Sequence, residues 1–280
     1  MGFLDKLTAA IRRSGSTLCV GLDPTLDALP EGVERSAAGV LRFNQAIVEA
    51  TADLACAFKP NLAFYEALGA EGWRVLAETV RAVPDGIPVI ADAKRSDIGS
   101  TAAAYAAAIF DGLGFDACTV SPYLGYDGVA PFIDRPGRFA FVLCRTSNPS
   151  AGDLQDLVVD GAPLYQHVAR QVRDWHRPRS LGLVVGATDP VAAGAVAEDA
   201  TDLWLLAPGL GAQGGDLAAT ADALGPAASH TLWNASRAIA NAGHGPDYAR
   251  QARAAAQTLR DRINDALDSI SPISPRASQS

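Results

Sequence analysis

Short apolar runs alternate along the chain with longer segments in which alanine and other apolar residues recur at helical spacing. Each run is bounded by glycine, proline or polar residues, which is typical of buried strands. Eight strands are predicted in this way: TLCVGLD, CAFKPN, PVIADAK, ACTVSP, FAFVLCR, LGLVVGA, DLWLLAP and HTLWNAS. Helices are predicted between most of them and after the last, at residues 36–55, 72–83, 101–109, 162–176, 190–198 and 246–269.

Strands that alternate with helices pair in parallel, and eight such units in 280 residues predict a closed (β/α)8 TIM barrel. A doubly wound open sheet is the alternative. No linker-like change of composition interrupts the series, so residues 1–270 are expected to form one catalytic domain. The Ser- and Pro-rich tail at 271–280 is expected to be disordered. The loop at 146–160 is long enough to act as a lid, and a passive surface loop is the alternative reading.

Composition limits the kinds of molecule that the protein can bind and its location in the cell. A hydrophobic content of 49% supports a large core, and a formal net charge of −8 argues against a nucleic-acid or anionic-membrane surface. The amino-terminal 15 residues interrupt their apolar positions with charges, which predicts an amphipathic helix rather than a signal peptide, and no run is long enough to span a membrane. A cytoplasmic protein is therefore expected. The cysteines show no CxxC spacing and are expected to be buried thiols: Cys19, Cys56, Cys118 and Cys144.

Three charges are concentrated at the end of the third predicted strand, in the stretch IADAKRSDIGST. Asp92 and Lys94 are two residues apart on a strand and therefore share a face. Asp97 follows on a turn, from which it can reach the same site or a neighbouring subunit. Charges at the mouth of a core strand are costly unless they are paired or used in function. A structural ion pair is the alternative to an active site.

Two neighbouring strands also end in charged residues. Asp23 follows the first strand and Lys59 ends the second. In a barrel the reacting groups gather at the carboxyl ends of the strands. We therefore expect these two side chains to face the same cavity as Asp92 and Lys94, in a network of alternating charges that keeps the carboxylates ionised. For Lys59 taken alone, a snorkelling surface lysine is the alternative.

A glycine-rich segment, APGLGAQGGD at residues 207–216, follows the seventh predicted strand. Its glycines let backbone amides approach an anion, and the helix that follows adds its positive end. The segment is neither a Walker loop nor a complete dinucleotide fingerprint. Arg237 follows the eighth strand, where its guanidinium can grip phosphate oxygens. Because the loops after strands seven and eight form the recurrent phosphate site of TIM barrels, the two signals together predict a phosphate group.

These residues resemble those of the orotidine 5'-phosphate decarboxylases, over most of the chain from the first strand to Arg237. The family signature D-x-K-x-x-D is present as Asp92, Lys94 and Asp97. The longer segments FKPNLAFYEALG and DAKRSDIGSTA are similar to the longer bacterial, type 2 enzymes. Ser96 stands where this subfamily is expected to have glycine, and it leaves the charged positions unchanged. The resemblance implies conversion of orotidine 5'-monophosphate to uridine 5'-monophosphate and CO2, without a cofactor or metal.

The resemblance also implies a division of roles within the charge network. Lys94 would be the proton donor, with Lys59 beside it in the network and Asp92 next to the departing carboxylate. Asp97 and Thr101 would reach into the site of a neighbouring subunit. The protein is accordingly expected to be a homodimer with shared active sites.

Further residues would hold the substrate. By resemblance, Asp23 would contact the ribose and Ser147, in the RTSNP segment, the pyrimidine ring. Gln213 and Arg237 would hold the phosphate, and Pro208 is a further expected substrate-binding residue.

Two alternatives to this function remain open at the level of sequence. A barrel that acts on sugar phosphates, such as a hexulose-phosphate synthase or a ketogulonate-phosphate decarboxylase, shares the D-x-K-x-x-D strand and would require magnesium. Lys59 within FKPN favours the pyrimidine enzyme. A phosphate-ligand-binding barrel without turnover is the alternative from a different class, although all charged positions of the site are retained.

Overall fold

The predicted strands pair in parallel and close into a ring. The computed structural model describes residues 1–175, 179–210 and 216–270. The strands of the ring, in spatial order, are β2 (Ala57–Pro60), β1 (Leu18–Leu22), β10 (Thr231–Ala235), β9 (Trp204–Pro208), β8 (Leu181–Val185), β5 (Phe139–Arg145), β4 (Ala117–Val120) and β3 (Ile90–Arg95). Parallel bridges from Phe58 to Val89 and from Asn61 to Asp92 join β2 to β3. The predicted TIM barrel is thus confirmed, and the open-sheet alternative is wrong.

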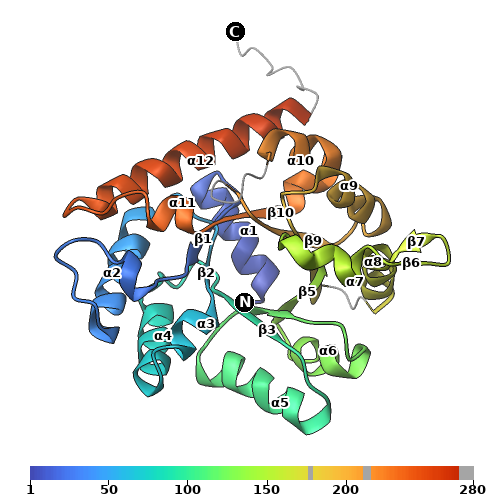
Figure 1. The fold of residues 1–280 in the computed structure, drawn as a ribbon, viewed down its shortest axis with the longest axis horizontal. Helices are drawn as coiled ribbons and strands as arrows, with labels where there is room; N and C mark the ends of the chain where they lie inside the picture. Colours follow the sequence, from blue (N-terminus) through green and yellow to red (C-terminus); the bar gives the residue numbers. More distant parts are fainter. Residues whose placement is uncertain (176–178, 211–215, 271–280) are drawn as a thin grey trace.

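Helices surround this ring (Figure 1). They are α2 (Ala37–Thr51), α3 (Leu62–Glu66), α4 (Ala70–Ala82), α5 (Gly99–Ala107), α6 (Tyr126–Ile133), α7 (Gly152–Gln155), α8 (Leu164–Trp175), α9 (Pro190–Asp199), α10 (Leu217–Leu224), α11 (Arg237–Ala240) and α12 (Tyr248–Ile270). The helix predicted from residue 162 begins at Leu164 instead. The two residues before it form β7 (Ala162–Pro163), which pairs with β6 (Val158–Val159) in a small antiparallel hairpin.

Local sequence explains where several helices begin. The Ser36 hydroxyl accepts a hydrogen bond from the Gly39 amide at 3.2 Å, at the start of α2. Asp189 caps α9 in the same way, and Pro190 follows at the first helical position. Short polar residues are favoured there because they satisfy amides that have no partner within the helix. Asp216, the last residue of the glycine-rich segment, does so for α10.

The amino-terminal helix α1 (Phe3–Ser14) closes one end of the barrel. Its apolar face packs against interior side chains that include Cys19, Phe139 and Leu232. The Phe3 amide donates to the carbonyl of Gly137, just before β5 begins, which places α1 at the amino ends of the strands. The predicted amphipathic helix is confirmed, and it covers the end of the barrel opposite to the carboxyl ends of the strands.

The described part of the chain contains all four cysteines, and each is buried as a free thiol, as expected. Burial raises the pKa of Cys19 to about 12, so this thiol stays protonated at neutral pH. The tail at 271–280 lies outside the described residues, so its expected disorder remains a prediction. Within the described ranges, no helix is both long and apolar enough to cross a bilayer.

Candidate active site

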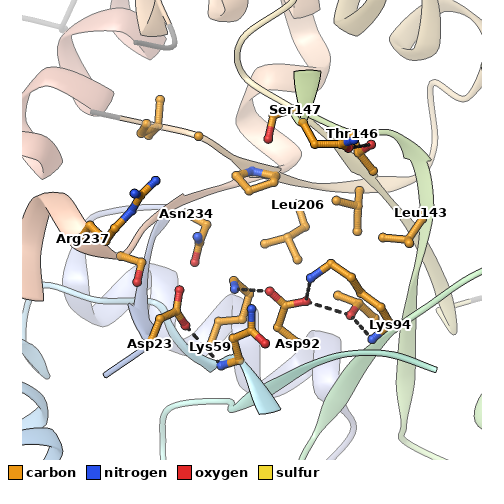
Figure 2. Close-up of a pocket in the computed structure, with 18 of the residues that line it drawn as sticks. Asp23, Lys59, Asp92, Lys94, Leu143, Thr146, Ser147, Leu206, Asn234 and Arg237 are labelled. Carbon is orange, nitrogen blue, oxygen red and sulfur yellow. Dashed lines mark hydrogen bonds and ion pairs between the residues drawn. The ribbon is translucent and has the colours of Figure 1, made fainter. Parts of the chain in front are cut away.

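A cavity of about 580 Å³ lies at the carboxyl ends of the barrel strands. Figure 2 shows polar side chains from opposite sides of the ring turned toward it. Its lining includes most of the residues singled out in the sequence: Asp23, Lys59, Asp92, Lys94, Ser147, Pro208 and Arg237. Because these residues lie in or just after the carboxyl-terminal parts of six different strands, the closed ring is what brings them together.

Asp92 lies between two lysines. Its Oδ2 atom is 2.7 Å from the Lys59 ammonium, and its Oδ1 atom is 2.5 Å from the Lys94 ammonium (Figure 2). Lys59 is 3% exposed, so the snorkelling alternative is wrong for this residue. Lys94, in contrast, is half-exposed and faces the cavity. The geometry therefore offers one buried cation that fixes the carboxylate and one accessible cation that can meet a ligand.

Burial and charge oppose each other in this network. Burial alone would lower the pKa of Lys59, but the carboxylates of Asp92 and Asp23 outweigh it and raise that pKa above its usual value. Burial would likewise raise the pKa of Asp92, but Lys59 and Lys94 outweigh it and hold that pKa well below the usual range. The Lys59–Asp92 pair consequently stays charged across the neutral pH range.

Asp23 occupies the next position around the ring. Its Oδ1 atom accepts a hydrogen bond from the Asn61 amide at 3.2 Å. The Asn61 side chain in turn caps α3 by accepting from the Ala63 amide. Asp23 is thereby held at the cavity wall, with its second oxygen available to a ligand hydroxyl.

Asp97 and Thr101 are not in the lining of this cavity. The Asp97 carboxylate accepts from the neighbouring Ile98 amide at 2.9 Å, and Thr101 is exposed on α5. Within one copy of the chain, the third charge of the D-x-K-x-x-D signature is therefore not brought into the site.

The far end of the cavity is formed after β9 and β10. Pro208, Gly209 and Arg237 line it. Gly21 on β1 allows close packing here, because a Cβ atom at that position would lie 2.5 Å from the Ser236 Cβ. Arg237 is the first residue of α11, and its side chain extends toward the cavity (Figure 2). Gln213 lies outside the described residues, together with the rest of the central half of the glycine-rich segment, residues 211–215.

The loop after β5 brings Ser147 to the cavity. Its first residue, Thr146, is bound by the side chain of Gln155 on α7, whose Oε1 accepts from the Thr146 amide at 2.8 Å. Arg145 forms an ion pair with Asp156 at 3.0 Å. The start of the loop is thus bound to the segment at residues 155–156, and the loop's expected role as a lid remains a prediction.

Sequence reasoning missed several polar residues of the lining: Asn61, Thr119, Thr146, Asn148, Gln155, Asn234 and Ser236. One signal could have found two of them. Asn61 and Asn234 lie at or beside strand ends, the position that identified the charged residues. Gln155 gave no such signal, since its approach depends on how the loop after β5 folds back.

The fold and the site together define a TIM-barrel enzyme with a charged pocket at the carboxyl ends of its strands. Comparison with known proteins makes the assignment specific. A sequence profile described as the orotidine 5'-phosphate decarboxylase / HUMPS family matches residues 16–252, and the chain belongs to this family. The resemblance to the decarboxylase family is therefore confirmed, and the similarity to its type 2 enzymes stays a prediction.

Individual relatives support the same assignment. An orotidine 5'-phosphate decarboxylase from Herpetosiphon aurantiacus is 50% identical over 259 residues, which are 92% of this chain and 96% of the relative. The solved structure of Leishmania donovani OMP decarboxylase is similar with a TM-score of 0.85 and 43% identity, over 96% of this chain and 99% of that one. Leishmania donovani UMP synthase has a TM-score of 0.87 and 45% identity, over 95% of this chain but 57% of that one.

Proposed function

We propose that this chain is an enzyme that decarboxylates orotidine 5'-monophosphate to uridine 5'-monophosphate and CO2, the last step of UMP biosynthesis. The observation that carries this proposal is the Lys59–Asp92–Lys94 network at the cavity, in a chain that belongs to the decarboxylase family. The small-molecule partner is thus the nucleotide, and the net charge of −8 argues against nucleic acid as a further partner. A cytoplasmic location fits a biosynthetic enzyme of this kind.

The chemistry follows from the position of Lys94. When the substrate carboxylate leaves as CO2, the electron pair of the broken bond remains on the pyrimidine ring carbon as a carbanion. The Lys94 ammonium stabilises this charge and then gives the carbon its proton. Asp92 lies beside the departing carboxylate and orients Lys94, and Lys59 keeps Asp92 ionised. Solvent returns a proton to Lys94, so the cycle uses no cofactor.

The remaining lining residues hold the substrate in this proposal. Asp23 accepts from a ribose hydroxyl, and Ser147 contacts the pyrimidine ring. Pro208 lies in the wall between the ring and the phosphate. Arg237 and Gln213 hold the phosphate, at the end of the barrel where phosphate groups are commonly bound.

Two copies of the chain are proposed to share their sites. The support is the location of Asp97 and Thr101 outside the cavity of their own chain, beside exposed apolar side chains. Asp97 and Leu124 both approach Gly128 on α6, and α6 packs against α5. The exposed side chains of this surface are Ile98, Tyr105, Tyr123 and Leu124. A homodimer that covers this surface would bring Asp97 and Thr101 to the second copy's site.

The loss of orotidine nucleotide absorbance with purified protein tests the function directly. We expect turnover in the absence of added metal and in the presence of a chelator, with UMP and CO2 formed in equal amounts. Magnesium-dependent turnover of a sugar phosphate, with no turnover of the orotidine nucleotide, would support the sugar-phosphate alternative instead. Binding of the nucleotide without any turnover would support a binding barrel.

The phosphate contributes to turnover as well as to affinity in this proposal, because its binding energy closes the loops and organises the charges. We expect the nucleoside orotidine to turn over much more slowly than the nucleotide, even at saturation. Arg237→Ala should raise KM for the nucleotide by about 10- to 100-fold, the size of a lost charge-assisted contact. The same variant should leave kcat/KM for orotidine unchanged. Equal saturated turnover of both substrates would contradict this role.

A further inference from the structure

The hydroxyl group of Thr119 on β4 makes all the hydrogen bonds that a hydroxyl can make. The side chain is buried, with 2% of the residue exposed. Its Oγ1 atom accepts hydrogen bonds from the backbone amides of Ala93, at 3.0 Å, and Lys94, at 2.9 Å. The hydroxyl donates to Oδ1 of Asp92 at 3.1 Å. A hydroxyl has one donor and two acceptor positions, so all three are occupied.

The strand pairing explains why β3 needs this hydroxyl. The register between β3 and β4 runs regularly up to Ala91, opposite Cys118, and resumes only at Arg95, opposite Val120. Three residues of β3, Asp92 to Lys94, therefore bulge against the single residue Thr119. A bulge leaves amides without strand partners, and unpaired buried amides are costly. The Thr119 hydroxyl takes the place of the missing carbonyls.

The bulge also determines the backbone conformation of Lys94. Its φ angle is +47°, in the left-handed region that residues other than glycine rarely adopt. Such a conformation persists only where the surroundings hold it. The hydrogen bond from the Lys94 backbone amide to the Thr119 hydroxyl is one such restraint. The same hydroxyl bonds the carboxylate oxygen that meets the Lys94 ammonium. A chain of hydrogen bonds therefore begins and ends at Lys94. It runs from the Lys94 backbone amide through the Thr119 hydroxyl and the Asp92 carboxylate to the Lys94 ammonium.

We propose that Thr119 is a positioning residue for the decarboxylation, which holds Lys94 in its left-handed conformation so that the ammonium lies against the ring carbon that loses CO2. This inference rests on the proposed function. Threonine suits the role because its branched Cβ restricts the side-chain torsion, which keeps the hydroxyl aimed at the bulge. Valine has the same shape without the hydroxyl, and serine has the hydroxyl without the methyl group, so the two substitutions separate the contributions.

Three variants make the test. Thr119→Val should lower kcat about 100-fold, since misplacement of a reacting group by about 1 Å has an effect of that size, with KM within about threefold of wild type. Thr119→Ser should recover kcat to within about tenfold of wild type, because the three hydrogen bonds can form again. Thr51→Val is the matched control. Thr51 is also fully buried and bonds a backbone carbonyl, but it lies on α2, away from the cavity. Its kcat should be unchanged.

Ligand affinities separate positioning from a general loss of structure. The product UMP makes no use of the proton donor, so Thr119→Val should bind it as wild type does. A UMP analogue with an oxyanion on the carbon that carried the carboxylate resembles the carbanion, and its affinity should fall by the same factor as kcat/KM. Equal losses for both ligands would overturn the proposal.

Other outcomes are equally decisive. A folded Thr119→Val enzyme with wild-type kcat would overturn the proposal, and so would a serine variant as impaired as the valine variant. If Thr119→Val does not fold, Thr119→Ala is to be compared with Thr119→Ser by the same measurements. A wild-type protein without activity on the nucleotide would contradict the proposed function, whereas an active wild type with insensitive Thr119 variants would contradict only the positioning role.

Discussion

Replacement of Lys94 by alanine is expected to lower kcat by about 10,000-fold or more, because stabilisation of the carbanion and delivery of the proton are lost together. The two lysines of the network are not equivalent. Lys59 is buried behind Asp92, whereas Lys94 reaches the cavity with a half-exposed side chain. Of these two lysines, Lys94 is therefore the one whose ammonium is accessible to the reacting carbon. The measurement is the rate of nucleotide consumption at saturating substrate, with product identified.

The chain offers a matched control for this substitution. It contains three lysines, and Lys6 is the one outside the site. Lys6 forms an ion pair with Asp116 at 2.8 Å near the closed end of the barrel. Lys6→Ala removes a paired lysine without touching the cavity, so its kcat should match wild type even if its thermal stability falls. A Lys94→Ala enzyme that keeps UMP affinity and near-normal turnover would remove Lys94 from the role of proton donor.

The barrel could be predicted from the sequence because its strands are buried on both faces. β1, β4, β8 and β10 are buried at every position, so each is a largely apolar run in the sequence. The charged site could be predicted for a related reason. Asp23, Lys59, Asp92 and Lys94 interrupt or follow such runs at their carboxyl ends, where a parallel barrel gathers its side chains.

Features that depend on contacts between distant segments could not be predicted. The register shift that leaves Thr119 opposite three residues of β3 is a relation between two strands, and neither strand encodes it alone. Thr119 itself appears in the sequence as an ordinary residue of an apolar run. Gln155 reaches Thr146 only because the loop after β5 folds back on itself. The hairpin at β6 and β7 likewise replaces the start of a predicted helix.

Asp97→Ala is expected to lose most activity, by about 100-fold or more, although Asp97 lies outside the cavity of its own chain. The proposed dimer explains this, since each site would consist of Asp92 and Lys94 from one copy and Asp97 from the other. Mixing Lys94→Ala with Asp97→Ala subunits should then restore activity. A hybrid dimer has one site with both substitutions and one site with neither.

The amount of recovery is set by this geometry. Random exchange of equal amounts makes about half of the dimers hybrid, so about one quarter of all sites become intact. Lys94→Ala mixed with Asp92→Ala is the matched control, because both residues belong to the same copy's site and every site in the hybrid then carries one defect. Recovery in the first mixture but not in the second would establish shared sites. If labelled subunits exchange and neither mixture recovers activity, Asp97 does not act across the interface. The activity lost in Asp97→Ala would then come from an effect within the same chain.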